Sequence, residues 1–191
     1  MQQERRLILI RHSLPVMRAD VPAARWALSP EGQQRCKTLA EVLRTYTPEV
    51  VVTSREPKAV ETGDLIAERL AVPVVQGEGL HEHDRRNVEL FPSRAEFESR
   101  VARFFAAPEV LIFGQETADE AHARFAAAVH RVMASRAEEN VAIVTHGTVM
   151  TLYVSRVVGL EPLPFWRSLG LPALVVLTWP ALHLDVVRSQ L

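Results

Sequence analysis

Short apolar runs bounded by polar residues recur along the chain and predict buried strands. Near-continuous runs of Val, Ile and Leu are typical of strands that are covered on both faces, as in a parallel sheet. The runs of this kind cover residues 7–10, 50–52, 141–144 and 171–179, and a further short strand is expected over residues 73–75. The chain is therefore expected to build a central sheet whose strands come from most of its length.

Between these runs the apolar positions recur with the period of a helix. Segment 30–45 places its apolar residues, Leu39 and Leu43 among them, on one side, with charged residues opposite. Ser29 directly before it is a suitable N-cap. Further helices are expected over residues 59–70, 93–105 and 118–140. Strands that alternate with helices predict an α/β fold, a three-layer sandwich.

Charged and polar side chains stand at the carboxyl ends of two predicted strands. Arg11 and His12 follow the first run, and His146 and Gly147 follow the run that ends near residue 145. Both histidines can meet at one edge of the sheet, because neighbouring parallel strands end there together. Arginine offers a planar, charged fork for phosphate, and a neutral histidine beside it can be a nucleophile. The pattern favours phosphoryl chemistry over a merely solvated strand end.

Five segments occur in an order that resembles a known family. They are residues 11–13 (RHS), 26–34, 53–62, 80–82 and 145–147 (THG). With these segments the chain resembles the histidine phosphatase superfamily, also called the phosphoglycerate mutase-like group. The resemblance implies a three-layer α/β/α sandwich with a mostly parallel sheet, formed as a single domain over residues 1–191.

The resemblance also implies a role for each candidate residue. His12 would attack phosphorus and carry a phosphohistidine intermediate, and Glu82 would protonate the leaving oxygen and then activate water. That task needs a carboxyl whose proton affinity is raised by its surroundings. The residues expected to hold the phosphate are Arg11, Ser13, Lys58, His146 and Gly147. The chemistry implied needs no metal and no other cofactor.

Two of these residues depart from the usual pattern of the family. Ser13 stands where glycine is usual, and it would bring a hydroxyl donor close to the phosphate. Lys58 stands where a second arginine is usual, and lysine keeps the charge but loses the bidentate fork. Arg55 is the alternative source of this charge, although Glu56 and Pro57 predict a turn that aims Arg55 elsewhere.

The helix and strand pattern loosens over residues 78–114, which we interpret as a lid-like insertion above the carboxyl edge of the sheet. His81 and His83 alternate within it and could bind zinc from one face of a strand. These two histidines with Asp84 do not complete a zinc site, so we expect histidines that contact substrate or solvent.

Composition narrows the classes of protein. The 191 residues, 48% of them apolar, suffice for one substantial core. A formal net charge of −1 gives no broad electrostatic case for nucleic acid or an anionic membrane. The apolar run ahead of Arg11 is too short for a secretory signal, so a cytoplasmic protein is expected. The single cysteine, Cys36, fits a small buried hydrophobe.

Three functional hypotheses follow. The leading one is a metal-independent phosphatase acting on a small phosphorylated substrate or a phosphoprotein, protein phosphohistidine included. Mutase-type transfer shares its first step, but apolar residues 14–17 replace the polar segment usual in phosphoglycerate mutases. A phosphate-binding regulatory protein with weak or no turnover is the third, because Ser13 and Lys58 depart from the family pattern. The apolar segment 174–187 would either complete the sheet or pair two copies in a homodimer.

Overall fold

The first apolar run forms β1 (Arg5–Arg11) in the interior of the sheet in the computed structural model of the chain. The structure describes residues 5–88, 91–136 and 140–190, and in these ranges six strands form one sheet in the order β3-β2-β4-β1-β5-β6. The other strands are β2 (Val50–Thr53), β3 (Val74–Gln76), β4 (Val141–Thr145), β5 (Ala173–Trp179) and β6 (Leu184–Arg188). Strands β1 to β4 are parallel, whereas β5 is antiparallel to both of its neighbours. The predicted α/β fold with a mostly parallel sheet is confirmed.

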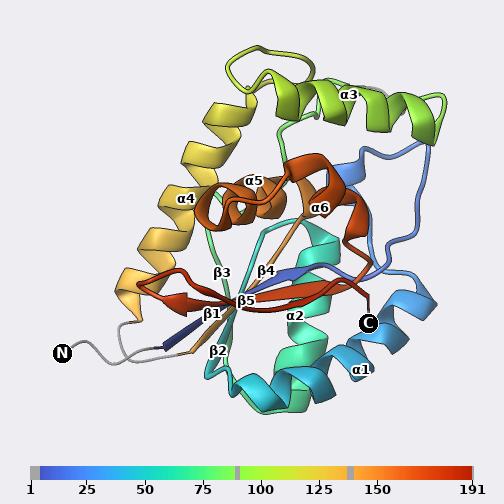
Figure 1. The fold of residues 1–191 in the computed structure, drawn as a ribbon. Helices are drawn as coiled ribbons and strands as arrows, with labels where there is room; N and C mark the ends of the chain where they lie inside the picture. Colours follow the sequence, from blue (N-terminus) through green and yellow to red (C-terminus); the bar gives the residue numbers. More distant parts are fainter. Residues whose placement is uncertain (1–4, 89–90, 137–139, 191) are drawn as a thin grey trace.

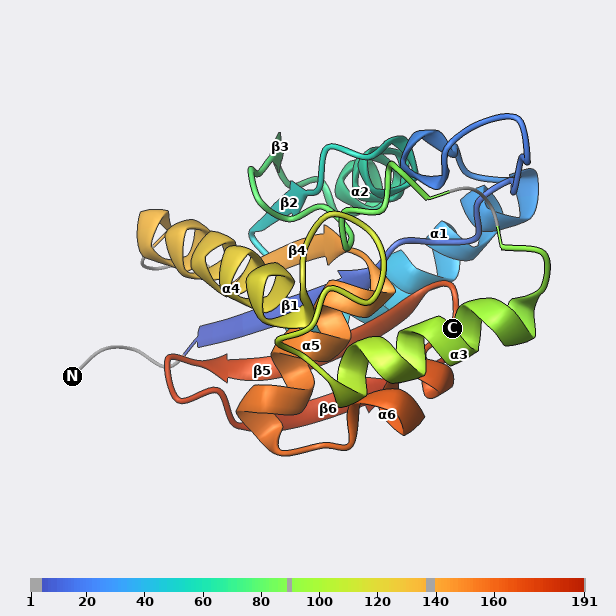
Figure 2. The same ribbon diagram turned by 90° about the horizontal axis from the view of Figure 1, so that it is seen from above.

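Helices cover both faces of this sheet (Figures 1 and 2). On one side lie α1 (Pro30–Leu43) and α2 (Pro57–Leu70), and on the other lie α3 (Arg94–Ala106), α4 (Ala118–Ser135), α5 (Gly147–Val158) and α6 (Pro162–Ser168). Short 3-10 helices cover Ala23–Arg25 and Arg44–Tyr46. Along β1, Ile8 and Ile10 enter the core under α1 and α2, while Leu7 and Leu9 enter the opposite core. This alternation produces the three layers.

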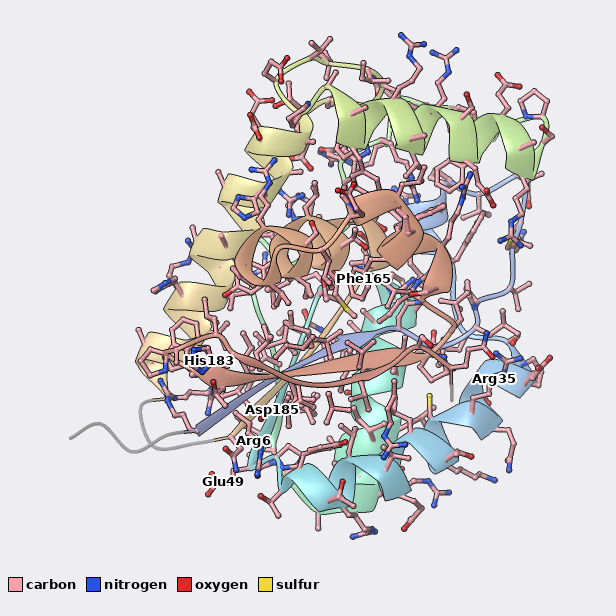
Figure 3. All side chains as sticks on the ribbon, in the orientation of Figure 1. Arg6, Arg35, Glu49, Phe165, His183 and Asp185 are labelled. Carbon is pink, nitrogen blue, oxygen red and sulfur yellow. The ribbon has the colours of Figure 1, made fainter. Side chains whose placement is uncertain are left out.

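Contacts from α1 and α6 tie the helical layers to the sheet (Figure 3). Phe165 on α6 is buried in the core that also contains Leu7 and Leu9. On the opposite side, Arg35 of α1 donates from a guanidinium nitrogen to the carbonyl of Leu171, at 2.7 Å. The segment before β5 is thereby attached to the helix that covers it.

Helix α1 begins where the sequence predicts. The hydroxyl of Ser29 accepts a hydrogen bond from the backbone N–H of Gly32 at 2.9 Å, which satisfies a donor of the first turn. A side chain at Gly32 would place its Cβ 2.1 Å from the carbonyl oxygen of Leu14, so the chain needs glycine there. Cys36, one turn later, is fully buried, as expected of a small hydrophobe.

Helix α4 is shorter than predicted, because it ends at Ser135 rather than at Asn140. Asn140 instead connects strands. Its side-chain oxygen accepts from the backbone N–H of Arg6 at 2.8 Å, and its carbonyl accepts from the N–H of Glu49 at 2.9 Å. These bonds hold Asn140 in the entry to β4, which makes a helical conformation unavailable to it. Residues 137–139 lie outside the described part of the chain.

The apolar C-terminal segment completes the sheet. Strand β5 is buried along most of its length, and β6 pairs with it at the edge, where Leu184 and Val187 are partly exposed. A homodimer through this edge stays a prediction. Among the described residues, no helix is long and apolar enough to cross a membrane.

The predicted insertion at residues 78–114 contains α3 and irregular segments on both sides of it. Its apolar residues pack on the core, since Phe104 is fully buried and its ring lies 5.6 Å from that of Phe113. Residues 89–90 lie outside the described ranges. The insertion is therefore anchored to the domain through α3, and its function as a lid stays a prediction.

Candidate functional site

Three neighbouring strands end side by side and bring the candidate residues together. His12 follows β1, Ser54 follows β2 and His146 follows β4. The backbone N–H groups of His12 and Ser54 still bond to carbonyls of β4, both at 2.9 Å, which fixes these strand ends in register. The rings of His12 and His146 meet edge to face with centroids 5.2 Å apart. Both histidines thus share one edge of the sheet, as the strand pattern predicts.

The ring of His12 is buried and held in one orientation. Its Nδ1 lies 2.8 Å from the carbonyl oxygen of Ser13. Because a carbonyl can only accept, Nδ1 carries the proton and Nε2 keeps its lone pair. Burial lowers the pKa of His12 well below its usual value, and the neighbouring charges of His146, Lys58 and Arg11 lower it further. His12 is therefore neutral near pH 7, with Nε2 free to act as a nucleophile.

Arg11 supplies a buried cation beside the two histidines. Its guanidinium donates to the carbonyl of Leu169 at 2.5 Å, whereas its Nε has no hydrogen-bond partner within the described residues. Burial lowers the pKa of Arg11 to about 10, so the group stays charged at neutral pH. A Cβ at Gly147 would lie 3.0 Å from this Nε. Gly147 therefore leaves room for Arg11, and its role in phosphate binding stays a prediction.

The structure corrects the expectation for Ser13. Its hydroxyl donates to the carbonyl of Gly32 at 2.8 Å, and its backbone N–H donates to the hydroxyl of Thr62 at 3.0 Å. A serine has one hydroxyl proton, and here that proton is used inside the protein. Ser13 joins the end of β1 to α1 and does not offer a donor to a phosphate.

Lys58, and not Arg55, lies beside the histidines. The Lys58 side chain is buried, and its Nζ donates to the carboxylate of Glu56 and to the carbonyl of Ala23, both at 2.6 Å. Arg55 is exposed and pairs with Glu78 at 2.9 Å. The Glu56–Pro57 turn does direct Arg55 away, so the second charge of the site is that of Lys58.

The carboxylate of Glu82 contacts the first turn of α5, and both of its oxygens accept hydrogen bonds. They accept from the backbone N–H groups of His83 (2.9 Å), Thr148 (3.1 Å) and Val149 (3.2 Å). Burial raises the pKa of Glu82, but the positive charge of Arg85, the neighbouring imidazole of His146 and the N–H groups of His83 and Thr148 outweigh burial and hold that pKa well below its usual range. A proton donor needs a raised proton affinity, whereas the surroundings of Glu82 lower it.

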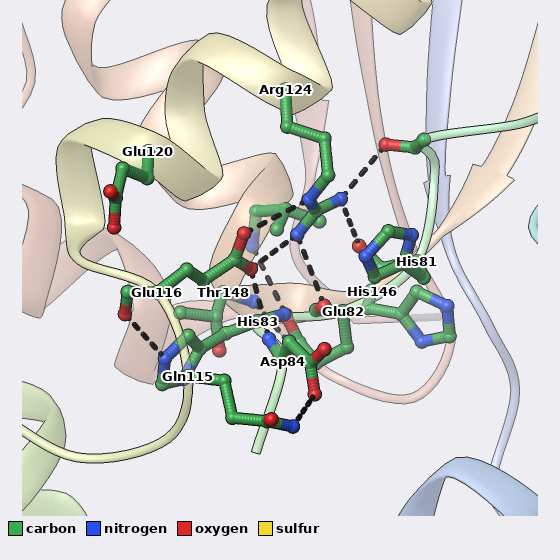
Figure 4. Close-up of polar contacts among 12 residues, drawn as sticks. His81, Glu82, His83, Asp84, Gln115, Glu116, Glu120, Arg124, His146 and Thr148 are labelled. Atoms are coloured by element: carbon green, nitrogen blue, oxygen red, sulfur yellow. Dashed lines mark hydrogen bonds and ion pairs between the residues drawn. The ribbon is translucent and has the colours of Figure 1, made fainter. Parts of the chain in front are cut away.

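A polar scaffold on α4 holds the segment that carries Glu82 (Figure 4). Arg124 donates to the carbonyls of Gly79 and His81, both at 2.9 Å, and to that of Glu82 at 3.2 Å. The carboxylate of Glu116 pairs with Arg124 at 2.5 Å and accepts the backbone N–H of Asp84 at 2.9 Å. The hydroxyl of Thr145, at the end of β4, also donates to the carbonyl of Leu80 at 2.9 Å. The acidic residue of the site is thus positioned from α4 and from the sheet together.

His81 and His83, the two candidate zinc ligands, lie in different surroundings. His83 is buried against Phe104 and Phe113, with ring centroids 4.3 and 4.7 Å away, and its Nε2 lies 3.1 Å from the carbonyl of Glu116. His81 is only partly buried. Within the described ranges no group of three or more His, Cys, Asp or Glu residues could hold a metal ion.

Two residues of this region, Glu56 and Arg85, are not predicted from the sequence as part of the site. Glu56 lies 3.5 Å from Nε2 of His146, which also contacts the hydroxyl of Ser54 at 2.8 Å. Arg85 lies over the ring of Phe97 at 4.8 Å, and one of its guanidinium nitrogens is buried with no partner in the described part of the chain. The only signal in the sequence is their proximity to Lys58 and Glu82, and proximity does not give side-chain direction.

The two buried histidines make stability depend on pH. Burial lowers the pKa of His12 and of His146 well below 6.5, so the folded state keeps both neutral while the unfolded state takes up protons on acidification. Their contribution is complete above pH 6.5 and is lost as the pH falls from there. We expect the free energy of unfolding to fall by about 1.4 kcal/mol per pH unit for each histidine.

Denaturant titrations between about pH 7 and pH 5 measure this slope. His12→Asn should lower the slope of the free energy of unfolding against pH by about 1.4 kcal/mol per pH unit, which corresponds to one proton. His183→Asn, which removes an exposed histidine, should leave the slope unchanged. Equal slopes in the parent protein and in His12→Asn would contradict the assignment.

Comparison with known proteins agrees with this geometry. The model of one family, the histidine phosphatase superfamily (branch 1), matches residues 7–189. Among curated proteins, the uncharacterized phosphatase PhoE of Bacillus subtilis is 24% identical over 145 residues, which cover 76% of this chain and 69% of that protein.

Solved structures share the fold at low identity. Mycobacterial glucosyl-3-phosphoglycerate phosphatase Rv2419c superposes with a TM-score of 0.75 at 19% identity, covering 99% of this chain and 100% of the other. YhfR of Bacillus stearothermophilus superposes with a TM-score of 0.75 at 21% identity, covering 98% of each chain. At these identities the structures support the fold alone.

Proposed function

Because the chain belongs to the histidine phosphatase superfamily, we propose that it hydrolyses phosphomonoesters through a phosphohistidine formed on His12. The orientation of the His12 ring is the observation that carries this proposal. Its Nδ1 proton is committed to the Ser13 carbonyl, so Nε2 has a lone pair at the sheet edge shared by Arg11 and His146. A neutral nucleophile surrounded by cations suits attack on a phosphate.

In the first step Nε2 of His12 attacks phosphorus opposite the leaving oxygen. The P–N bond forms as the P–O bond breaks, and Arg11, Lys58 and His146 offset charge on the remaining phosphate oxygens. Glu82, which takes up a proton from solvent as the phosphate dianion binds, gives that proton to the leaving oxygen. A bound phosphate dianion raises the pKa of Glu82, because a like charge nearby disfavours the ionised carboxylate. The substrate thereby counteracts the low proton affinity that the surroundings give to Glu82.

In the second step water attacks the phosphohistidine. Glu82 accepts a proton from that water, the P–N bond breaks, and inorganic phosphate leaves His12 neutral with Glu82 protonated again. The sum of both steps is one ester and one water converted to one alcohol and one phosphate. His12 and Glu82 return to their starting states, so neither step consumes a cofactor.

The pairing of Lys58 with Glu56 favours a second candidate, a phosphate-binding protein with weak or no turnover. A lysine held at 2.6 Å by a carboxylate attracts phosphate less than a free lysine does. In both candidates the ligand is a phosphorylated small molecule or phosphoprotein, and the two candidates differ in whether the phosphate is released by hydrolysis.

Hydrolysis of an aryl phosphate in excess chelator tests the proposal. We expect turnover that survives chelation, and a phosphoenzyme after rapid quenching in alkali that mass spectrometry assigns to His12. A phosphate label on any other residue, or turnover that chelation abolishes, would overturn the mechanism. Phosphate binding with no turnover on any ester in a panel of aryl and alkyl phosphates would favour the second candidate.

A further inference from the structure

A carboxylate, that of Glu56, lies between Lys58 and His146 at the sheet edge. One oxygen of Glu56 lies 2.6 Å from Nζ of Lys58. The other accepts the backbone N–H of Glu82 at 3.0 Å and lies 3.5 Å from Nε2 of His146. Only 12% of the Glu56 side chain is exposed. These partners, a lysine, a histidine and a backbone N–H, are the donor types that bind phosphate oxygens.

The position of Glu56 in the chain does not require this inward orientation. Glu56 is the N-cap residue of α2, where a carboxylate can accept from the first backbone N–H groups of its own helix. Its side chain makes no such bond and turns into the site instead. A buried carboxylate next to a phosphate would repel it, so its presence there has a cost for phosphate binding.

We propose that Glu56 sets the affinity of this pocket for phosphate by holding Lys58 and occupying the place of a phosphate oxygen. The proposal rests on the proposed function, in which the pocket takes a phosphate. When a substrate enters, its phosphate displaces the Glu56 carboxylate and takes over Lys58. After hydrolysis Glu56 returns to Lys58 and helps to expel the inorganic phosphate, so Glu56 is a specificity-determining residue that keeps product inhibition weak.

The test is the affinity for inorganic phosphate, measured by calorimetry and as competitive inhibition of aryl phosphate hydrolysis. Glu56→Gln keeps an oxygen that can accept the Glu82 N–H but removes the charge that opposes phosphate. We expect it to bind inorganic phosphate roughly tenfold more tightly or better than the parent protein. Glu68→Gln, at an exposed carboxylate on the same helix, is the matched control and should leave the affinity unchanged.

A second variant identifies the route of the effect. If Glu56 acts by holding Lys58, Glu56→Gln should tighten phosphate binding in the parent protein but not in a Lys58→Gln background, so the single variant Lys58→Gln and the double variant should bind phosphate equally. A merely structural role for Glu56 would weaken binding on substitution, so a tighter complex separates the two roles.

Unchanged or weaker phosphate binding in Glu56→Gln, with binding retained in the parent, would overturn this inference and leave the proposed function standing. Absence of phosphate binding in the parent and in both variants would overturn the proposed function and this inference with it.

Discussion

Replacing His12 by alanine is expected to lower kcat/KM for an aryl phosphate by about 10³-fold or more, because the variant lacks the atom that bonds to phosphorus. The remaining cations, Arg11 and Lys58, still attract the substrate. The loss should therefore fall on kcat, while the dissociation constant of inorganic phosphate changes little. Steady-state kinetics with the aryl phosphate and calorimetry with phosphate measure the two quantities separately.

Added imidazole provides the control for this variant. The truncated side chain leaves space at the sheet edge, and a free imidazole bound there can accept the phosphoryl group in place of His12. Partial recovery of turnover with imidazole would show that the loss is chemical and not a failure to fold. Turnover of His12→Ala within about tenfold of the parent would place the nucleophile elsewhere.

Glu82→Gln should have the second largest effect, and the size of that effect should depend on the leaving group. Alkyl alcohols are poor leaving groups that need a proton, so kcat for an alkyl phosphate should fall by about 10²- to 10⁴-fold. An aryl phosphate with an acidic phenol leaves without a proton, so its first step should be far less sensitive. Parallel kinetics with the two esters give the comparison.

The dependence of the rate on pH tests the role of Glu82 independently. The parent needs protonated Glu82 for the alkyl ester, so its rate should fall as the pH rises above the pKa of Glu82 in the complex. That basic limb should vanish in Glu82→Gln. Glu109→Gln, which removes an exposed carboxyl, is the control that should keep it. Equal losses for both esters with an unchanged profile would contradict a proton donor at Glu82.

The strands and the residues at their ends are the part of the molecule that sequence predicts well. Strands β1, β2 and β4 are buried on both faces, and this leaves continuous runs of Val, Ile and Leu in the sequence. The same runs end in His12 and His146, and parallel pairing then brings them together without any knowledge of side-chain direction. The order and direction of the strands are therefore sufficient to predict that His12 and His146 lie close together.

Side-chain direction is what sequence does not reveal. The Ser13 hydroxyl turns to the Gly32 carbonyl because α1 packs next to it, and Glu56 turns inward because Lys58 and the Glu82 N–H lie there. Both choices depend on partners that are distant in the chain. The low proton affinity of Glu82 has the same origin, since its donors come from the start of α5. No local pattern contains this information.

The nucleophile and the acid of the proposed reaction are held by different parts of the fold, because Arg124 of α4 binds the backbone around Glu82 and does not contact His12 through any of these bonds. The nucleophile directly follows a strand, whereas the segment that carries the acid is held by Arg124 of α4 and by Thr145 of β4 through backbone carbonyl groups, which any residue can supply. The side chain of His81, which is only partly buried, can therefore be exchanged without loss of these anchors, whereas Leu80 is fully buried in the core. A transfer of the Glu82 loop into another protein would therefore also have to include Arg124 and Glu116. Without these two residues the loop would lack the hydrogen bonds that hold its backbone in place.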